Sequence, residues 1–227
     1  RHTRFRNVTG VQTCALPISE TIGTIAYLNE HLDHLQKTTK AGFVITCCGD
    51  PGEFSLMPSR TGNTYADRLA ETVLSQLHPD FRRYSFLERG SDERQYCAPL
   101  VDLPVASIMR SKYHEYAEYH TSLDDLSFIT PDALRETLEV YARVVLVAEH
   151  NCTPRPRIYG EPHLSKYGLY PTTGGQVNQS VIGPILDVLA LSDGTTDLLT
   201  LAARLSIDVV TLREIVDLLQ RKGLLEY

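Results

Sequence analysis

The sequence predicts an α/β domain with a mostly parallel sheet flanked by helices, followed by a small winged helix-turn-helix domain. Over residues 20–150, stretches with helical spacing of apolar residues alternate with short apolar runs, a pattern typical of a largely parallel sheet. A connector rich in proline and glycine follows at 151–175, and three helical patterns fill 176–227. With 42% hydrophobic and 22% charged residues, the 227-residue chain has the composition of a globular protein.

Three helices and three strands are expected in the first domain. Apolar residues recur at helical spacing over 20–37 and 63–77. Thr130 and Pro131 start a third helix that runs to about His150, because threonine caps helix N-termini and proline suits the first turn. The strands are predicted at three short apolar runs, 41–48, 84–87 and 105–108.

The C-terminal region is predicted to form three helices, over 181–191, 197–205 and 209–222. Gly223 ends the last of them before a short apolar strand, and this order resembles a winged helix-turn-helix. Residues 172–227 carry four basic and seven acidic side chains, and a net charge of −3 mostly repels the phosphates of DNA. The charge therefore favours a protein-interaction or dimerisation role, with a protein partner or a second copy of the chain, over DNA binding.

The first nineteen residues are expected to lie outside the native protein. Residues 8–19 resemble the translation of a common sequencing adaptor, and the proline and polar residues within them make a poor signal-peptide core. The native region would then begin near Glu20 and continue upstream of it. Because residues 1–19 hold three arginines and no acid, the net charge is −6 for the whole chain but −9 for 20–227. Such acidity is the opposite of the basic footprint of a general nucleic-acid binder.

Cysteine usage and hydropathy favour a reducing, cytoplasmic setting. The five cysteines are irregularly spaced and include no C-x-x-C pair, so a disulfide framework is not expected. The adjacent Cys47 and Cys48 stand in an apolar run and are predicted to be buried thiols. The longest aliphatic run, 144–148, is much shorter than the roughly 20 residues of a membrane-spanning helix.

The first segment with candidate chemistry is the polar stretch 90–96. It follows a predicted strand, and loops after the strands of parallel sheets commonly bind ligands. Its neighbouring carboxylates, Asp92 and Glu93, supply either a metal ligand or a general base. The alternative is a solvated turn in which Arg94 pairs with one of them.

The second segment is 119–125. His120 is a candidate zinc ligand through one ring nitrogen, with a nearby carboxylate, Asp124 or Asp125, orienting the other nitrogen. The alternative is a surface histidine beside acidic residues.

Together the two segments resemble the zinc-dependent exopeptidase superfamily of bacterial aminopeptidases and glutaminyl cyclases. Ser91–Asp92, Leu103–Ile108 and Tyr119–Asp124 are similar to its Ser-Asp loop, its Gly-Ile-Pro-Ala type strand and its Tyr-His-Thr-x-x-Asp segment. Residues 84–129 and 161–171 look like one bacterial subgroup, the polysaccharide biosynthesis proteins with an aminopeptidase-like domain that end in a winged helix. The resemblance covers essentially the whole native region.

The resemblance implies a zinc ion and roles for particular residues. His120 matches the superfamily's last zinc-binding histidine. Glu20 matches a Glu-Glu-x-Gly region in which one glutamate is the general base and the next is a zinc ligand. Because Thr21 stands at the second position here, the resemblance assigns Glu20 as the base.

The remaining implied roles concern the metal shell and the substrate. The superfamily's aspartate ligand falls near Thr46, and Asp92 or Glu93 is a candidate to compensate for it as a metal ligand. A guanidinium can bind a substrate carboxylate bidentately, and aromatic rings can line a pocket. The substrate-binding candidates of these two kinds are Arg94, Tyr96 and Tyr119.

Two functions are therefore weighed. The first is a zinc-dependent aminopeptidase-like hydrolase of amide bonds in a peptide or small molecule, in which zinc acidifies a water and a carboxylate takes its proton. The second is a non-catalytic aminopeptidase-like scaffold whose winged helix binds a protein partner or regulates transcription. The intact segments 91–96 and 119–125 favour the enzyme, whereas Thr21 and Thr46 favour the scaffold. The chain by itself is expected to be inactive, because the superfamily's other metal ligands lie upstream of Glu20.

Overall fold

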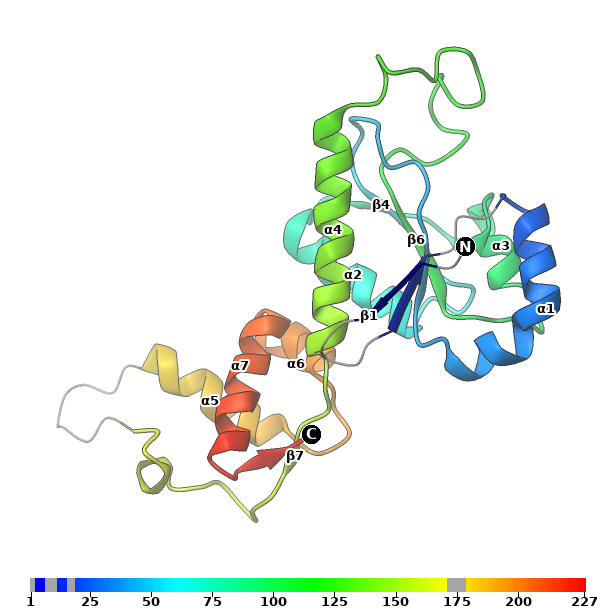
Figure 1. Ribbon diagram of the computed structural model, residues 1–227. Coiled ribbons are helices and arrows are strands. Elements are labelled where there is room, and N and C mark those ends of the chain that lie inside the picture. Colours follow the sequence, from blue (N-terminus) through cyan, green and yellow to red (C-terminus); the bar gives the residue numbers. More distant parts are fainter. Residues whose placement is uncertain (1–2, 7–11, 16–18, 171–178) are drawn as a thin grey trace. The chain divides into compact units, whose positions relative to one another are not determined.

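A computed structural model of the chain describes residues 3–6, 12–15, 19–170 and 179–227 (Figure 1). The chain separates into two units, Arg1–Val145 and Leu146–Tyr227. Within the expected adaptor-derived segment, β1 (Thr3–Arg6) pairs antiparallel with β2 (Gln12–Ala15). Ser19 is also described, whereas residues 1–2, 7–11 and 16–18 of that segment lie outside the described residues.

The first unit is built on a four-stranded sheet in the order β3-β6-β4-β5. Strands β3 (Gly42–Val44) and β6 (Val105–Met109) are parallel, as are β4 (Ser55–Met57) and β5 (Arg82–Arg83). The central pairing of β4 with β6 is antiparallel. The predicted mostly parallel sheet flanked by helices is confirmed.

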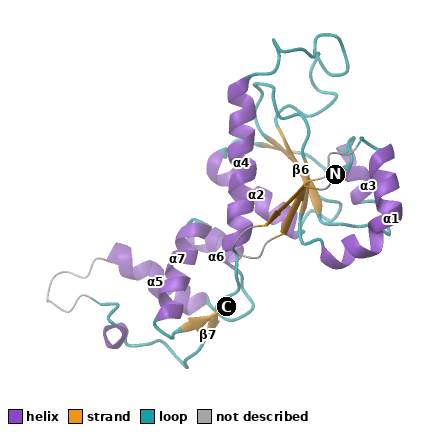
Figure 2. Ribbon diagram, in the orientation of Figure 1, coloured by secondary structure: helices purple, strands orange, loops and turns teal. Residues whose placement is uncertain are grey.

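Helices cover both faces of this sheet (Figure 2). On one side lie α1 (Ile22–Thr38) and the short α3 (Glu93–Tyr96), and on the other lie α2 (Tyr65–Leu77) and the part of α4 (Pro131–His150) that belongs to this unit. All five residues of β6 are buried, as expected for a central strand with both faces covered. The three long helices lie where the apolar periodicity predicts them.

Two strand predictions are wrong, and the backbone gives the reasons. The run 84–87 is not a strand, because Ser85 and Glu88 form a capping box that starts the 3₁₀ helix η1 (Phe86–Glu88). The strand expected over 41–48 ends at Val44, and Cys47 beyond it has a left-handed φ of 49° that no strand allows. Strand β4, at Ser55–Met57, was not predicted, because a buried strand of three residues shows no periodicity.

The second unit is a winged helix. It contains α5 (Gln179–Leu191), α6 (Leu198–Leu205) and α7 (Val209–Arg221), and β8 (Leu225–Glu226) pairs antiparallel with β7 (Arg155–Pro156). A 3₁₀ helix, η2 (Leu164–Tyr167), precedes residues 171–178, which lie outside the described residues. The core is apolar, and its fully buried side chains include Leu198, Leu201, Leu212, Leu219 and Leu224.

Two further features concern the chain's setting. Among the described residues, no helix is both long and apolar enough to cross a membrane. The cysteines at positions 47, 48, 97 and 152 are all free thiols.

Candidate functional site

The candidate site is a cavity of about 270 Å³ in the first unit. The loop after β3 and the long loop after β6 form most of its wall, with Glu20 at its edge just before α1. Four of the candidate site residues singled out from the sequence line it, namely Glu20, Tyr119, His120 and Asp124. Thr46, which falls near the superfamily's aspartate ligand, lines it too. The fold thus brings together polar side chains from the beginning and from the later part of the unit's sequence. Loops at the ends of strands commonly form binding sites in this way.

Asp92 fixes the chain beside Glu20. Its Oδ1 accepts a hydrogen bond of 2.7 Å from the backbone N–H of Thr21, the residue at the N-cap of α1. Arg94 reaches the same residue, donating from Nη2 to the Thr21 hydroxyl at 2.5 Å. Neither Asp92 nor Arg94 lines the cavity. Asp92 thus holds the backbone next to Glu20, and Arg94 holds the Thr21 side chain.

Glu93 is completely buried behind the cavity wall. Its Oε1 accepts from the backbone N–H groups of Gly90 (2.9 Å) and Ser91 (3.0 Å) and from the Tyr113 hydroxyl (2.6 Å). Its Oε2 has no hydrogen-bond partner among the described residues. Burial and the neighbouring Glu93 carboxylate both raise the pKa of Tyr113, whose ring lines the cavity. Glu93 therefore holds the tyrosine and the loop that carries Ser91.

His120 is exposed and stacks on the Tyr119 ring, with a distance of 3.9 Å between ring centroids. Glu20 and Tyr119 line the same cavity, and burial together with the negative charge of Glu20 raises the pKa of Tyr119. Asp124 lines the same cavity, whereas the Asp125 carboxylate accepts from the backbone N–H of Ser127 at 2.7 Å. Of the two carboxylates expected to orient the histidine, Asp124 alone lines the cavity.

A wall of aromatic side chains was not foreseen from the sequence. Tyr116 stacks on Phe128 at 5.3 Å between centroids and meets the Tyr119 ring edge-on at 5.6 Å. The Tyr116 hydroxyl also contacts the Cys47 sulfur at 3.6 Å. The sequence signal was a tyrosine at every third position, 113, 116 and 119. Tyr96, in contrast, packs in the apolar core around Leu28.

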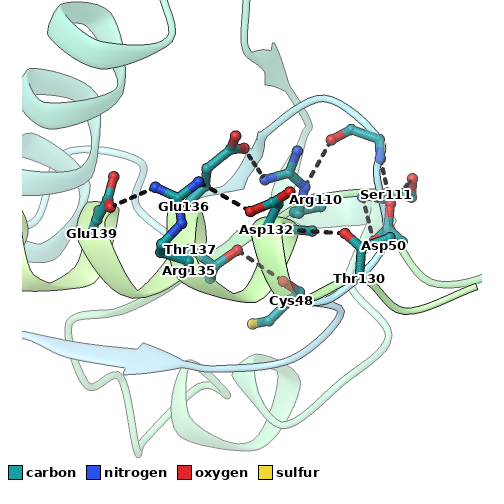
Figure 3. A network of polar contacts seen from close by, with 12 residues as sticks. Cys48, Asp50, Arg110, Ser111, Thr130, Asp132, Arg135, Glu136, Thr137 and Glu139 are labelled. Atoms are coloured by element: carbon teal, nitrogen blue, oxygen red, sulfur yellow. Dashed lines mark hydrogen bonds and ion pairs between the residues drawn. The ribbon is translucent and has the colours of Figure 1, made fainter. Parts of the chain in front are cut away.

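The loop after β3 is anchored by a polar network (Figure 3). The buried Asp50 carboxylate accepts from the Gly52 backbone N–H at 2.9 Å and from the Ser111 hydroxyl at 2.6 Å. From α4, the Thr137 hydroxyl donates to the Cys48 carbonyl at 2.9 Å. Arg110 donates from Nε to the Gly52 carbonyl at 2.9 Å. The loop is thus tied to the end of β6 and to α4.

Backbone strain gathers around the cavity. Four non-glycine residues in the cavity wall or next to it in the chain have left-handed φ angles: Thr21 (62°), Cys47 (49°), His114 (66°) and His120 (56°). Such conformations cost about 1–3 kcal/mol each and cluster at functional sites. The strain supports the assignment of this cavity as the functional site of the unit.

The described residues do not form a complete metal site. Among them, no group of three or more histidine, cysteine, aspartate or glutamate side chains is arranged to hold a metal ion. The zinc ion implied by the resemblance therefore does not fit the described residues as a full coordination shell, although Glu20 and His120 line one cavity.

Known families match both units. A family described as a domain of unknown function, DUF4910, matches residues 13–151. The chain belongs to this family. A winged helix-turn-helix family matches residues 152–227, in agreement with the fold of the second unit.

A curated relative and a solved structure, both from Clostridium acetobutylicum, resemble this DUF4910 chain. A curated relative named "Putative polysaccharide biosynthesis protein with aminopeptidase-like domain" is 35% identical over 211 residues, covering 91% of this chain and 48% of the relative. A crystal structure of a "putative peptidase" superimposes with a TM-score of 0.80 at 32% identity, covering 95% of this chain and 47% of that one. The chain thus combines an aminopeptidase-like domain with a winged helix, and it spans about half the length of the curated relative.

Proposed function

We propose that the protein containing this chain is a zinc-dependent aminopeptidase-like hydrolase of amide bonds, and that the cavity is part of its active site. The observation that carries the proposal is the meeting of Glu20, Tyr119 and His120 in one cavity, although they come from opposite ends of the unit. The aminopeptidase-like domain in the relative's name and the strained backbone around the cavity support it.

The proposed roles follow from the chemistry of each side chain. The Glu20 carboxylate takes a proton from the attacking water and passes it to the leaving amine. In the longer protein His120 would supply one zinc ligand, and the zinc would supply Lewis-acid chemistry at the scissile carbonyl. Tyr119 lines the substrate pocket. Because the described residues lack three clustered ligands, we assign no zinc-dependent step to this chain alone and expect it to be inactive.

The substrate we propose is a peptide or a small molecule with an amide bond. A part in polysaccharide biosynthesis rests on the name of the relative alone. The free thiols fit the cytoplasmic setting that we also propose, since such compartments keep thiols reduced.

Metal analysis and peptide hydrolysis test the roles of Glu20 and His120 in the longer protein. We expect His120→Ala to lose both zinc and activity. Glu20→Gln is expected to keep zinc but to lower kcat at least about 100-fold, the usual contribution of a general base. Asp132→Asn, an exposed position on α4 outside the cavity, serves as the control.

Two results would contradict these assignments. Stoichiometric zinc in the 227-residue chain, lost in His120→Ala, would refute the incomplete metal site from which we infer that the chain alone is inactive. Absence of turnover in a zinc-loaded longer protein would refute the hydrolase and point to the scaffold.

For the winged helix we propose a protein-interaction or dimerisation role. Arg213 lies on α7, and its guanidinium is already engaged, with Asp217 at 2.8 Å and the Tyr227 hydroxyl at 2.5 Å. An arginine that is already paired within the protein is less available to neutralise DNA phosphates. A gel shift at low salt is expected to show no DNA binding, and a salt-sensitive complex there would overturn this assignment.

A further inference from the structure

A second hollow of the first unit differs from the cavity in the charge of its lining side chains. It measures about 640 Å³, within the range of small-molecule sites. Its wall comes from three segments: the turn 58–62 after β4, residues 85–89 around η1, and residues 94–99 from α3 onward. We call it the arginine groove, because three arginines line it, at positions 60, 89 and 94.

The groove concentrates positive charge in an acidic chain. No aspartate or glutamate is among the described residues that line it. Elsewhere in this unit, arginines pair with carboxylates, as in the ion pairs Arg82–Glu115, Arg83–Glu71, Arg110–Glu136 and Arg135–Asp132. A local excess of guanidinium groups in a chain of net charge −6 indicates a site for an anion.

The three arginines differ in what they contact. Arg60 is neutralised by Asp102, to which it donates from Nε at 3.0 Å and from Nη2 at 2.7 Å. Arg89 lies over the Phe86 ring, with its Cζ 5.0 Å from the ring centroid. Arg94 donates to the Thr21 hydroxyl. Within the described part of the chain, neither Arg89 nor Arg94 forms an ion pair, so both keep their charge for a ligand.

The rest of the wall defines the body of the ligand. Phe86 and Pro99 line the groove, together with Leu87, whose side chain is 83% exposed. An exposed leucine beside an aromatic ring gains by covering its apolar surface. A guanidinium matches the two oxygens of a carboxylate or of a phosphate bidentately.

We propose that the arginine groove binds a small molecule that carries a carboxylate or phosphate group on an apolar or aromatic body. Arg89 and Arg94 bind the oxyanion, and Phe86 and Leu87 contact the body. Arg60 contributes little to binding of the oxyanion, because Asp102 already neutralises its charge. The site is separate from the cavity, so its occupation does not depend on the hydrolase proposed above.

Calorimetric titration of the whole chain tests this site with three probes: phenyl phosphate, benzoate and inorganic phosphate. We expect saturable binding of phenyl phosphate or benzoate, and the tighter of the two identifies the oxyanion. Phenyl phosphate should bind more tightly than inorganic phosphate, because only the former covers the apolar wall. Rising salt should weaken binding.

Matched variants test whether the probe binds in the arginine groove. Arg89→Gln and Arg94→Gln should each raise the Kd about tenfold, the effect of losing one charge-assisted hydrogen bond. Arg135→Gln removes the same charge from an exposed position on α4 and should change the Kd less than about twofold. The melting temperatures of the variants check that each is folded.

Absence of saturable binding by both aromatic probes would overturn the proposal. An equal loss in Arg135→Gln would overturn it as well, because binding would then reflect net charge alone. Loss of zinc or of hydrolysis in the longer protein would leave this result unchanged, so the two proposals fail independently.

Discussion

The cavity and the arginine groove lie in the same unit but have opposite charge. Carboxylates of Glu20, Asp50 and Asp124 line the cavity, and no lysine or arginine is among the described residues of its wall. The groove has arginines and no described carboxylate. The two regions are linked through Thr21, which follows Glu20 in the chain and receives the hydrogen bond from Arg94. A unit that separates its charges in this way can hold the cationic and anionic groups of ligands in different places.

The two regions also differ in how their walls are held. Two buried carboxylates anchor the cavity wall, each with several hydrogen bonds: Asp50, which is part of the wall, and Glu93, which lies behind it. The groove wall is held partly by the buried Asp67 carboxylate, which accepts from the Ser59 backbone N–H at 2.7 Å, and partly by the exposed Arg60–Asp102 ion pair and the contact of Arg89 with the Phe86 ring. Buried hydrogen-bonded groups are costly to remove, whereas exposed ion pairs contribute little. Substitutions of Asp50 and Glu93 should therefore affect stability, whereas substitutions of the exposed groove arginines should affect binding.

The largest effect is expected from Asp50→Ala. Removal of the buried carboxylate leaves the Gly52 N–H and the Ser111 hydroxyl without their partner. We expect the free energy of unfolding to fall by ~3 kcal/mol, measured by urea denaturation. Asp124→Ala, at an exposed carboxylate of the same cavity, should change it by less than ~0.5 kcal/mol. Equal effects of the two variants would refute the expected difference between a buried, hydrogen-bonded carboxylate and an exposed one in the same cavity.

The second-largest effect is expected at alkaline pH, as a loss of stability. Burial raises the pKa of the Cys48 thiol from its usual 9.0 to about 11. The folded state therefore holds this proton more tightly than the unfolded state, so the stabilisation is complete below about pH 9 and is lost as the pH rises toward 11. Urea midpoints measured across this window should fall, and they should fall less steeply in Cys48→Ala. Identical slopes would show that Cys48 does not carry the effect.

A smaller loss is expected from Tyr113→Phe. The Tyr113 hydroxyl donates to buried Glu93 at 2.6 Å and accepts from the Gly90 N–H at 2.7 Å. Its removal should cost ~1 kcal/mol in the free energy of unfolding. Tyr119→Phe, at the ring that stacks on His120, should cost less than ~0.5 kcal/mol in the same measurement. A larger loss at Tyr119 would show that the buried hydrogen bonds of Tyr113 do not stabilise the cavity wall.

The smallest changes concern the ion pair of the groove. Arg60→Gln should weaken phenyl phosphate binding less than about twofold, because Asp102 already neutralises that arginine. Asp102→Asn frees the Arg60 charge and should tighten binding by about twofold to threefold in the same titration. Weaker binding in Asp102→Asn would show that Arg60 does not face the ligand.

Part of the candidate site could be predicted from the sequence. Glu20, Tyr119 and His120 were singled out through the resemblance, and the structure brings all three to one cavity. Asp92, Glu93 and Arg94 were singled out from the polar segment 90–96, but none of them lines the cavity: Asp92 bonds Thr21, Glu93 is buried behind the wall, and Arg94 lines the groove. Asp92 makes its contact with Thr21, 71 residues away in the chain, and no local pattern specifies a partner at that distance.

The sequence by itself determined the long helices, the mostly parallel sheet and the winged helix. These follow from apolar periodicity, capping residues and glycine positions, which act over a few neighbouring residues. Only the tertiary structure decided the short strand β4, the tyrosine wall and the arginine groove. Each depends on segments distant in the chain, since burial from both sides defines β4 and three separate loops meet to form the groove. A side chain in a loop is directed by the surface packed against it, and that surface exists only after the chain has folded.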